Sequence, residues 1–124
     1  MTGYRDGEPI DLWVVRLDGQ RVEEDTARAF EAMRVAASGD GVELHVTSGF
    51  RTQQEQQKLY RCWRRGRCPL AARPGRSRHQ SGLALDLDVR TSKKTGPWLA
   101  RHARQFGFRR TLMPEPWHWQ RDEP

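Results

Sequence analysis

Apolar positions along the chain follow two periods, one typical of strands and one typical of helices. Residues 12–17 form a short apolar run that ends at Asp18-Gly19, a turn signal, and this predicts a strand. Six mostly apolar positions then recur at helical spacing with charges between them: Val22, Thr26, Ala29, Phe30, Met33 and Ala37. They predict an amphipathic helix that ends near Ser38-Gly39.

The middle of the chain predicts a strand, a helix and a long loop. Val42, Leu44 and Val46 alternate with polar residues, as in a half-buried strand. Thr52 and Glu55 form a capping box for a helix, whose apolar face consists of Leu59, Tyr60 and Trp63. Residues 66–78 contain two prolines and two glycines, which predicts a loop.

The last third of the chain predicts one more strand and one more helix. Leucine or valine at every second position from 83 to 89 indicates a strand, and its other face carries Asp86 and Asp88. Pro97 suits the first turn of a helix that Gly107 closes. The apolar face of that helix comprises Trp98, Leu99, His102, Ala103 and Phe106.

The order of these elements predicts the fold class. Strands and helices mix without regular βαβ spacing, which favours an α+β fold with a small antiparallel sheet flanked by helices. A length of 124 residues predicts a single domain, residues 1–124. We expect the core to include the tryptophans on apolar faces, Trp13, Trp63 and Trp98, and we expect Trp117 and Trp119 in the core or in a pocket wall.

The charge of the chain narrows the classes of partner. The net charge is +6, which fits an anionic partner such as a cell-wall polymer, an acidic membrane surface or nucleic acid. No nucleic-acid-binding motif accompanies it, and we expect no nucleic acid partner. One arginine cluster lies at a predicted helix end, where the helix dipole favours cations: Arg61, Arg64, Arg65 and Arg67. The absence of an 18-residue apolar run excludes a transmembrane helix, and the five tryptophans exclude a disordered tail.

A set of histidine and carboxylate residues is a candidate metal centre. A catalytic zinc ion takes three nitrogen or oxygen ligands and keeps one position open for water. His79, Asp86 and His118 can supply these ligands, and Glu115 can serve as a general base if Pro114 and Pro116 bend its segment. The spacing alone leaves His45 and His102 as alternative ligands, although both suit structural roles better.

Three motifs stand in order along the chain: Ser48-Gly49-Phe50-Arg51-Thr52, Ser77 through Asp86 (SRHQSGLALD), and Glu115-Pro116-Trp117-His118-Trp119. They resemble the motifs of the D-alanyl-D-alanine carboxypeptidase family of LAS zinc peptidases, which is named for lysostaphin, D-Ala-D-Ala peptidases and Sonic hedgehog. The middle motif agrees with the family pattern SxHxxGxAxD at every fixed position, and the last agrees with ExxH. The resemblance extends over residues 42–119 and implies an LAS/hedgehog-like fold.

The resemblance also implies roles for single residues. His79, Asp86 and His118 correspond to the ligands of one Zn²⁺ ion, and Glu115 corresponds to the catalytic base. Arg51 corresponds to the arginine that binds the carbonyl or the developing oxyanion. The expected substrate contacts are Ser77, one of the neighbours Gln56 and Gln57, and Trp117 as a pocket wall.

Cys62 and Cys68 lie six residues apart on either side of Gly66. We favour a disulfide over two free thiols or a second metal site, because no other cysteines are present to complete such a site. A disulfide predicts an oxidising compartment, the cell envelope or the extracellular space. The N-terminal residues lack the apolar segment of a secretory signal. The chain therefore starts in the cytoplasm, has lost a leader, or leaves the cell by another route such as release by a phage.

The expected function is a zinc-dependent peptidoglycan peptidase that cleaves a stem-peptide bond involving D-alanine. The Glu-Pro-Trp-His form of the last motif resembles the D,D-carboxypeptidase branch, and Arg76 or Arg78 can bind a terminal carboxylate. The alternatives are an endopeptidase that cuts L-Ala-D-Glu links or cross-bridges, and a non-catalytic zinc-containing binding module. We expect a monomer whose partner is the stem peptide.

Overall fold

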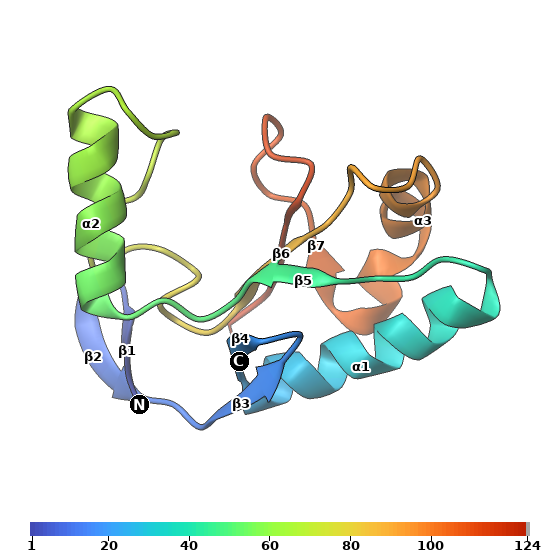
Figure 1. The fold of residues 1–124 in the computed structure, drawn as a ribbon. Helices are drawn as coiled ribbons and strands as arrows, with labels where there is room; N and C mark the ends of the chain where they lie inside the picture. The colour runs from blue at the N-terminus through green and yellow to red at the C-terminus, as the bar shows by residue number, and fades with distance from the viewer. Residues whose placement is uncertain (124) are drawn as a thin grey trace.

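The computed structural model describes residues 1–123 and has α+β architecture (Figure 1). Within these residues, three α-helices and a 3-10 helix accompany eight short strands. In chain order the elements are β1 (Thr2–Arg5), β2 (Glu8–Asp11), β3 (Val14–Leu17), β4 (Gln20–Glu23), α1 (Glu24–Gly39), β5 (Val46–Ser48), α2 (Gln53–Arg64), β6 (Ala84–Leu87), α3 (Thr95–His102), η1 (Ala103–Phe106), β7 (Phe108–Arg109) and β8 (His118–Arg121). The α+β class expected from the sequence is confirmed.

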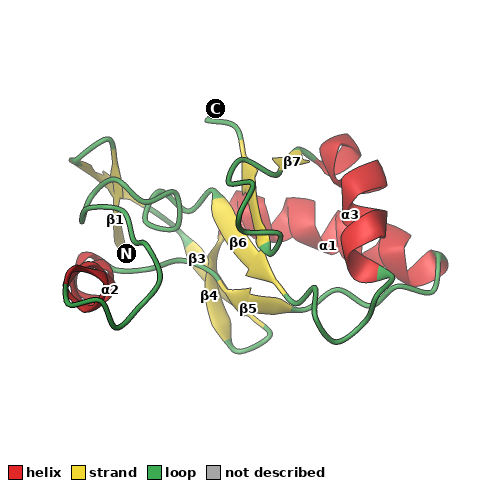
Figure 2. Ribbon diagram, turned by 90° about the horizontal axis from the view of Figure 1, so that it is seen from above, coloured by secondary structure: helices red, strands yellow, loops and turns green. Residues whose placement is uncertain are grey.

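A four-stranded antiparallel sheet separates the hydrophobic core from the face that carries the candidate metal ligands. Its strand order is β5-β6-β8-β7, so β6 and β8 are central. Side chains alternate between the two faces of a strand. Leu85 and Trp119 are paired across β6 and β8 and point into the core, whereas the paired Asp86 and His118 point to the opposite face. Helices α1 and α3 lie on the core side, and α2 stands apart on the other (Figure 2).

Helix α1 packs on the core face of the sheet. The Glu23 carboxylate caps it by accepting hydrogen bonds from the backbone N–H groups of Asp25 and Thr26. Phe30 and Met33 on this helix are fully buried, and each contributes about 1.5–3 kcal/mol by burial. Val22 was expected in this helix, but it lies in β4. The helix begins only at Glu24, after its N-cap residue Glu23.

Two β-hairpins turn at Asp-Gly pairs. Asp6 and Gly7, and likewise Asp18 and Gly19, have positive φ angles, as the two central residues of a type I′ turn require. The expected turn at 18–19 is confirmed and connects β3 to β4. The β1–β2 hairpin is an element that the sequence analysis did not predict, and its Tyr4 N–H donates to the Gln80 carbonyl at 2.9 Å.

Helix α2 and the loop after it lie opposite the non-core face of the sheet. The capping box of Thr52 and Glu55 is present as predicted, and the helix ends in the arginine cluster. Residues 66–78 contain no helix or strand, as expected. The Cys62–Cys68 disulfide joins the last turn of α2 to this loop, which confirms the pairing.

Several expectations about strands and tryptophans need correction. Residues 42–45 belong to no strand among the described residues, because the ladder with β6 begins only at Val46. Trp13 is 81% exposed and Trp63 is only half-buried, so neither belongs to the core. Trp98 is in the core as expected. Gly107 closes the predicted helix 97–106, whose last turn is η1.

Candidate functional site

Three side chains converge on the non-core face of the sheet. His79 comes from the loop before β6, Asp86 from β6, and His118 from the start of β8. The Asp86 Oδ1 atom lies 3.1 Å from His79 Nε2 and 3.5 Å from His118 Nδ1. One ligand atom from each residue lies within 4.8 Å of the other two, and all three residues are buried. The sequence analysis brought these three residues together correctly.

The far ring nitrogen of each histidine is held by a hydrogen bond. His79 Nδ1 lies 2.9 Å from the Gly49 carbonyl, and His118 Nε2 lies 3.0 Å from Gln120 Oε1. When protons sit on these far nitrogens and are donated to the two oxygens, the lone pairs of His79 Nε2 and His118 Nδ1 are free to bind a metal ion beside Asp86. Metal-ligating histidines are oriented in this way. The donor set of two nitrogens and one oxygen fits zinc and leaves a fourth position for water.

Local charges set the ionisation of the three groups. Burial raises the pKa of Asp86, but hydrogen bonds from both histidines and the charge of Arg51 outweigh it and hold this pKa well below its usual range. Burial lowers the pKa of His79 despite its bond to Asp86. Burial also lowers the pKa of His118, but the hydrogen bonds to Asp86 and Gln120 outweigh it, and the pKa is raised. Asp86 is therefore anionic and His79 neutral, the forms that a metal ion requires.

Glu115 reaches the site through a bend in the chain. The His118 N–H donates to the Glu115 carbonyl at 3.1 Å, which closes a tight turn between Pro114 and β8. In a straight strand, residues 115 and 118 would face opposite sides. In the structure both line one cleft, as the prolines indicated.

Arg51 lies on the other side of the metal-ligand set, after β5. Its Nη2 atom lies 3.4 Å from Asp86 Oδ2, and its own pKa is lowered by burial against the opposing charges of Asp86 and Glu115. Two residues earlier, Gly49 allows the segment to pack closely on β4, because a Cβ at this position would lie 2.2 Å from the Arg21 carbonyl. That carbonyl accepts the Phe50 N–H at 2.7 Å, so Gly49 is required for close backbone contact.

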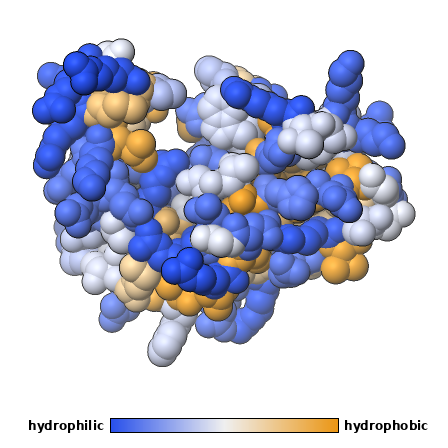
Figure 3. Space-filling view, viewed as in Figure 1, coloured by the Kyte–Doolittle hydropathy of each residue, from blue (hydrophilic) through white to orange (hydrophobic). Residues whose placement is uncertain are grey.

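These groups share a cleft of about 520 Å³ between the sheet, α2 and the loop after α2. The surface is hollowed between α2 and the segment before β8 (Figure 3). Ser77 and Trp117 line the cleft, and Arg76 and Arg78 lie on the same wall. Gln56 also lines it and donates to the Ala72 carbonyl at 2.9 Å, whereas Gln57 is not among its lining residues.

The alternative ligands lie elsewhere. The side chain of His45 is 57% exposed beside Glu43, at the end of β5 away from the cleft. His102 stacks on the Trp98 ring at 4.7 Å. Both therefore have structural surroundings, as their sequence positions indicated.

Two glutamines that support the site were not predicted from the sequence. Gln120 holds His118, and it accepts a further hydrogen bond from Thr111 at 2.8 Å. Gln80 is fully buried, accepts the Gly75 N–H and donates to Gln53, which ties the loop to α2. The signal for Gln120 was its place two residues after His118, on the same face of a strand. No local pattern marks Gln80.

A family model described as VanY, D-alanyl-D-alanine carboxypeptidase, matches residues 19–121. This range contains every residue of the site. The chain belongs to the VanY D-alanyl-D-alanine carboxypeptidase family.

Two bacterial relatives are similar to this VanY-family chain. A D-alanyl-D-alanine carboxypeptidase of Enterococcus faecalis is 30% identical over 133 residues, covering 83% of this chain and 49% of the relative. The peptidoglycan L-alanyl-D-glutamate endopeptidase CwlK of Bacillus subtilis is 38% identical over 68 residues, covering 53% of this chain and 40% of the relative. The chain thus spans about half the length, or less, of these relatives.

Two solved structures share the fold. A vancomycin-resistance D,D-pentapeptidase VanY variant in complex with Zn(II) is 28% identical, with a TM-score of 0.74, and the match covers 98% of this chain and 86% of that one. VanYB in complex with D-alanine-D-alanine is 27% identical with the same TM-score, and the match covers 90% and 78%. The LAS-type fold expected from the motifs is therefore confirmed.

Proposed function

We propose that the chain is a zinc-dependent D,D-carboxypeptidase that removes the terminal D-alanine from a peptidoglycan stem peptide. The observation that carries this proposal is the cleft in which His79, Asp86 and His118 meet Glu115 and Arg51. A structural metal site needs neither a general base nor an arginine beside it. This pairing therefore argues against a non-catalytic binding module.

The three ligands would hold the metal, and the surrounding residues have separable tasks. When bound, zinc lowers the pKa of a coordinated water to about 7 and polarises a carbonyl oxygen. Glu115 accepts a proton from the attacking water as the new C–O bond forms, and returns it to the leaving amine as the C–N bond breaks. Arg51 donates to the substrate oxygen on which negative charge develops.

Recognition of the terminal carboxylate falls to Arg76 rather than Arg78. Both residues line the cleft, and the Arg76 guanidinium lies beside Gly7 in the β1–β2 turn. Arg78 forms an ion pair with Glu123, whereas Arg76 makes no ion pair within residues 1–123. An unpaired guanidinium can form a bidentate pair with a carboxylate without first losing a partner.

The second candidate is an endopeptidase, which the similarity to the Bacillus subtilis L-alanyl-D-glutamate endopeptidase favours. Such an enzyme also needs a metal ion, a base and an oxyanion donor. It does not need a group that binds a free carboxylate. The role of Arg76 therefore separates the two activities.

The test is digestion of purified pentapeptide muropeptides and cross-linked dimers, with and without a chelator, followed by mass spectrometry. The carboxypeptidase predicts loss of one D-alanine from the pentapeptide, and the chelator abolishes that loss. Cleavage inside the stem or the cross-bridge supports the endopeptidase instead. If neither substrate is cut by the zinc-loaded protein, the catalytic proposal is wrong.

We also infer a monomer that works in the cell envelope or outside the cell. The Cys62–Cys68 disulfide supports this location, because disulfides persist in oxidising compartments. Alkylation of the protein in intact cells, followed by mass spectrometry, tests the location, since two alkylated cysteines contradict it. Light scattering of the purified chain tests the oligomeric state.

A further inference from the structure

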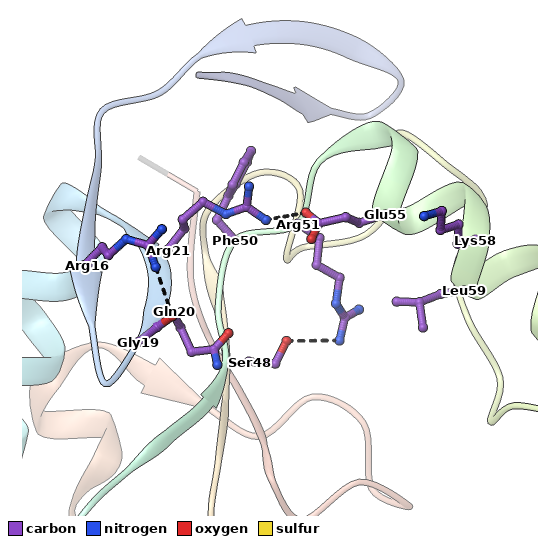
Figure 4. A pocket seen from close by; sticks show the side chains of 10 residues that line it. All are labelled: Arg16, Gly19, Gln20, Arg21, Ser48, Phe50, Arg51, Glu55, Lys58 and Leu59. Carbon is purple, nitrogen blue, oxygen red and sulfur yellow. Dashed lines mark hydrogen bonds and ion pairs between the residues drawn. The ribbon is translucent and has the colours of Figure 1, made fainter.

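A second cavity, of about 610 Å³, opens beside the catalytic cleft (Figure 4). One wall is the β3–β4 hairpin, with Arg16, Gln20 and Arg21, and the other is α2, with Lys58 and Leu59. Arg51 and Leu59 line both this cavity and the catalytic cleft. A ligand in the cleft can therefore extend past Arg51 into the second cavity.

The cavity carries positive charge that the protein does not neutralise. Arg21 is paired with Glu55, and Arg51 lies against Asp86. Arg16 and Lys58 form no ion pair in the described part of the chain. Within residues 1–123, the Arg16 side chain donates a single hydrogen bond, to the Gly19 carbonyl at 3.4 Å. Two uncompensated cations on opposite walls favour an anionic group between them.

The substrate geometry indicates which part of a ligand reaches this cavity, and this step rests on the proposed function. A D,D-carboxypeptidase releases one residue, so the leaving side of its substrate is a single D-alanine. Only the acyl side is long enough to extend beyond Arg51. The second cavity is too large for one alanine and lies away from Arg76, the residue assigned to the terminal carboxylate.

We propose that the cavity between the β3–β4 hairpin and α2 is a subsite for an acidic residue on the acyl side of the substrate peptide. Arg16 and Lys58 supply the positive charge that attracts its carboxylate. The amide of Gln20 lies on the same wall as Arg16 and can hydrogen-bond to the peptide (Figure 4). The subsite gives the enzyme a preference for acidic stem peptides over amidated ones.

The test compares two stem pentapeptides that differ only in one group, the α-carboxylate of D-glutamate or its carboxamide. For the wild type, kcat/KM is expected to be about fivefold higher for the acidic peptide, mainly through KM, which is the scale of two partly exposed ion pairs. The Arg16→Gln/Lys58→Gln variant is expected to lose this preference and to cleave the amidated peptide like the wild type. Salt should reduce the wild-type preference, because the groups are exposed.

The matched control is Lys93→Gln/Arg101→Gln, which removes the same charge from exposed positions near and on α3, across the sheet from the cavity. This control should keep the preference. If the wild type does not discriminate between the two peptides, or if the control loses the preference as well, the subsite is wrong.

A binding experiment tests the subsite separately from the proposed catalytic activity. Calorimetry with the corresponding acidic and amidated tetrapeptides, which lack the terminal D-alanine, measures the subsite without turnover. Tighter binding of the acidic tetrapeptide to the wild type only, about fivefold, supports the subsite even if no D-alanine is released. Equal binding of both tetrapeptides, together with displacement by a glycerol-phosphate oligomer, assigns the charge to a phosphate polymer and overturns the proposal.

Discussion

The backbone N–H of Arg51 donates to the backbone carbonyl of His79 at 3.2 Å. In return, the His79 ring bonds to the carbonyl of Gly49, two residues before Arg51. The segment that carries Arg51, the residue assigned to the oxyanion, and the loop that carries the metal ligand His79 are thus tied together by two hydrogen bonds. The side chain of either can be changed without removing the backbone bond that aligns the two segments.

Replacement of Arg51 tests the oxyanion assignment. Arg51→Gln should lower kcat by about 10²–10³-fold, because one donor to the developing negative charge is lost. Zinc content should remain one equivalent, since the backbone bond to His79 persists. Steady-state kinetics and metal analysis of the same sample measure both effects. A variant with the wild-type kcat would remove Arg51 from the mechanism.

Gln120 should act on the metal through His118. Gln120→Leu removes the acceptor at His118 Nε2, 3.0 Å away, and should weaken zinc affinity by about 10–100-fold. Competition with a chromophoric chelator measures this affinity. Gln54→Leu, an exposed glutamine on α2, serves as the control and should bind zinc like the wild type. Unchanged affinity in Gln120→Leu would mean that the His118 ring needs no such support.

The disulfide should stabilise the fold and hold the cleft wall. Cys62→Ser/Cys68→Ser opens a short covalent loop and should cost about 2–2.5 kcal/mol of unfolding free energy in the chain-entropy model. It should also raise KM, because residues 68–72 line the cleft. Urea unfolding and kinetics under non-reducing conditions test both effects. Wild-type values for both would show that the rest of the loop suffices.

Asp18 should make stability depend on acid pH. Burial raises its pKa, but the Val46 N–H and Arg34 outweigh this, and the pKa lies below its ordinary value. A depressed pKa stabilises the fold above the unfolded-state value near 3.8, and this stabilisation is lost as pH falls through the folded value.

Asp18→Asn isolates that contribution, because asparagine tolerates the positive φ of this turn position. The variant should lose about 1 kcal/mol at pH 7, after allowance for a side chain that is 23% exposed. The difference from the wild type should shrink below pH 4. Urea midpoints at pH 7 and pH 3 measure it, and a constant difference would contradict the assignment.

The sequence predicted the site better than it predicted the scaffold. Residues that carry chemistry are constrained by type and spacing, so His79, Asp86 and His118 could be named with Glu115 and Arg51. The β1–β2 hairpin also has a local signal, Asp6-Gly7, but its strands are short and lack a clear apolar face. What stabilises that hairpin is its contact with the loop at Gln80, which no local pattern reveals.

Other differences arise from long-range packing. The alternating residues 42–45 have a strand pattern, but no partner strand reaches them among the described residues, so only Val46–Ser48 joins the sheet. Trp13 lies before β3 on an apolar run and is nevertheless exposed, because nothing in the described residues covers that side of the hairpin. Local periodicity cannot predict which face of a short strand finds a neighbour.

The most direct test of the account is the release of D-alanine from a stem pentapeptide by the zinc-loaded wild type and by Glu115→Gln, with exposed Glu43→Gln as the control. The account predicts that the wild type and the control release one D-alanine per peptide. Glu115→Gln should be slower by about 10²–10⁴-fold and should keep one equivalent of zinc. Equal rates in Glu115→Gln and the wild type, or wild-type release that persists after zinc is removed, would contradict it.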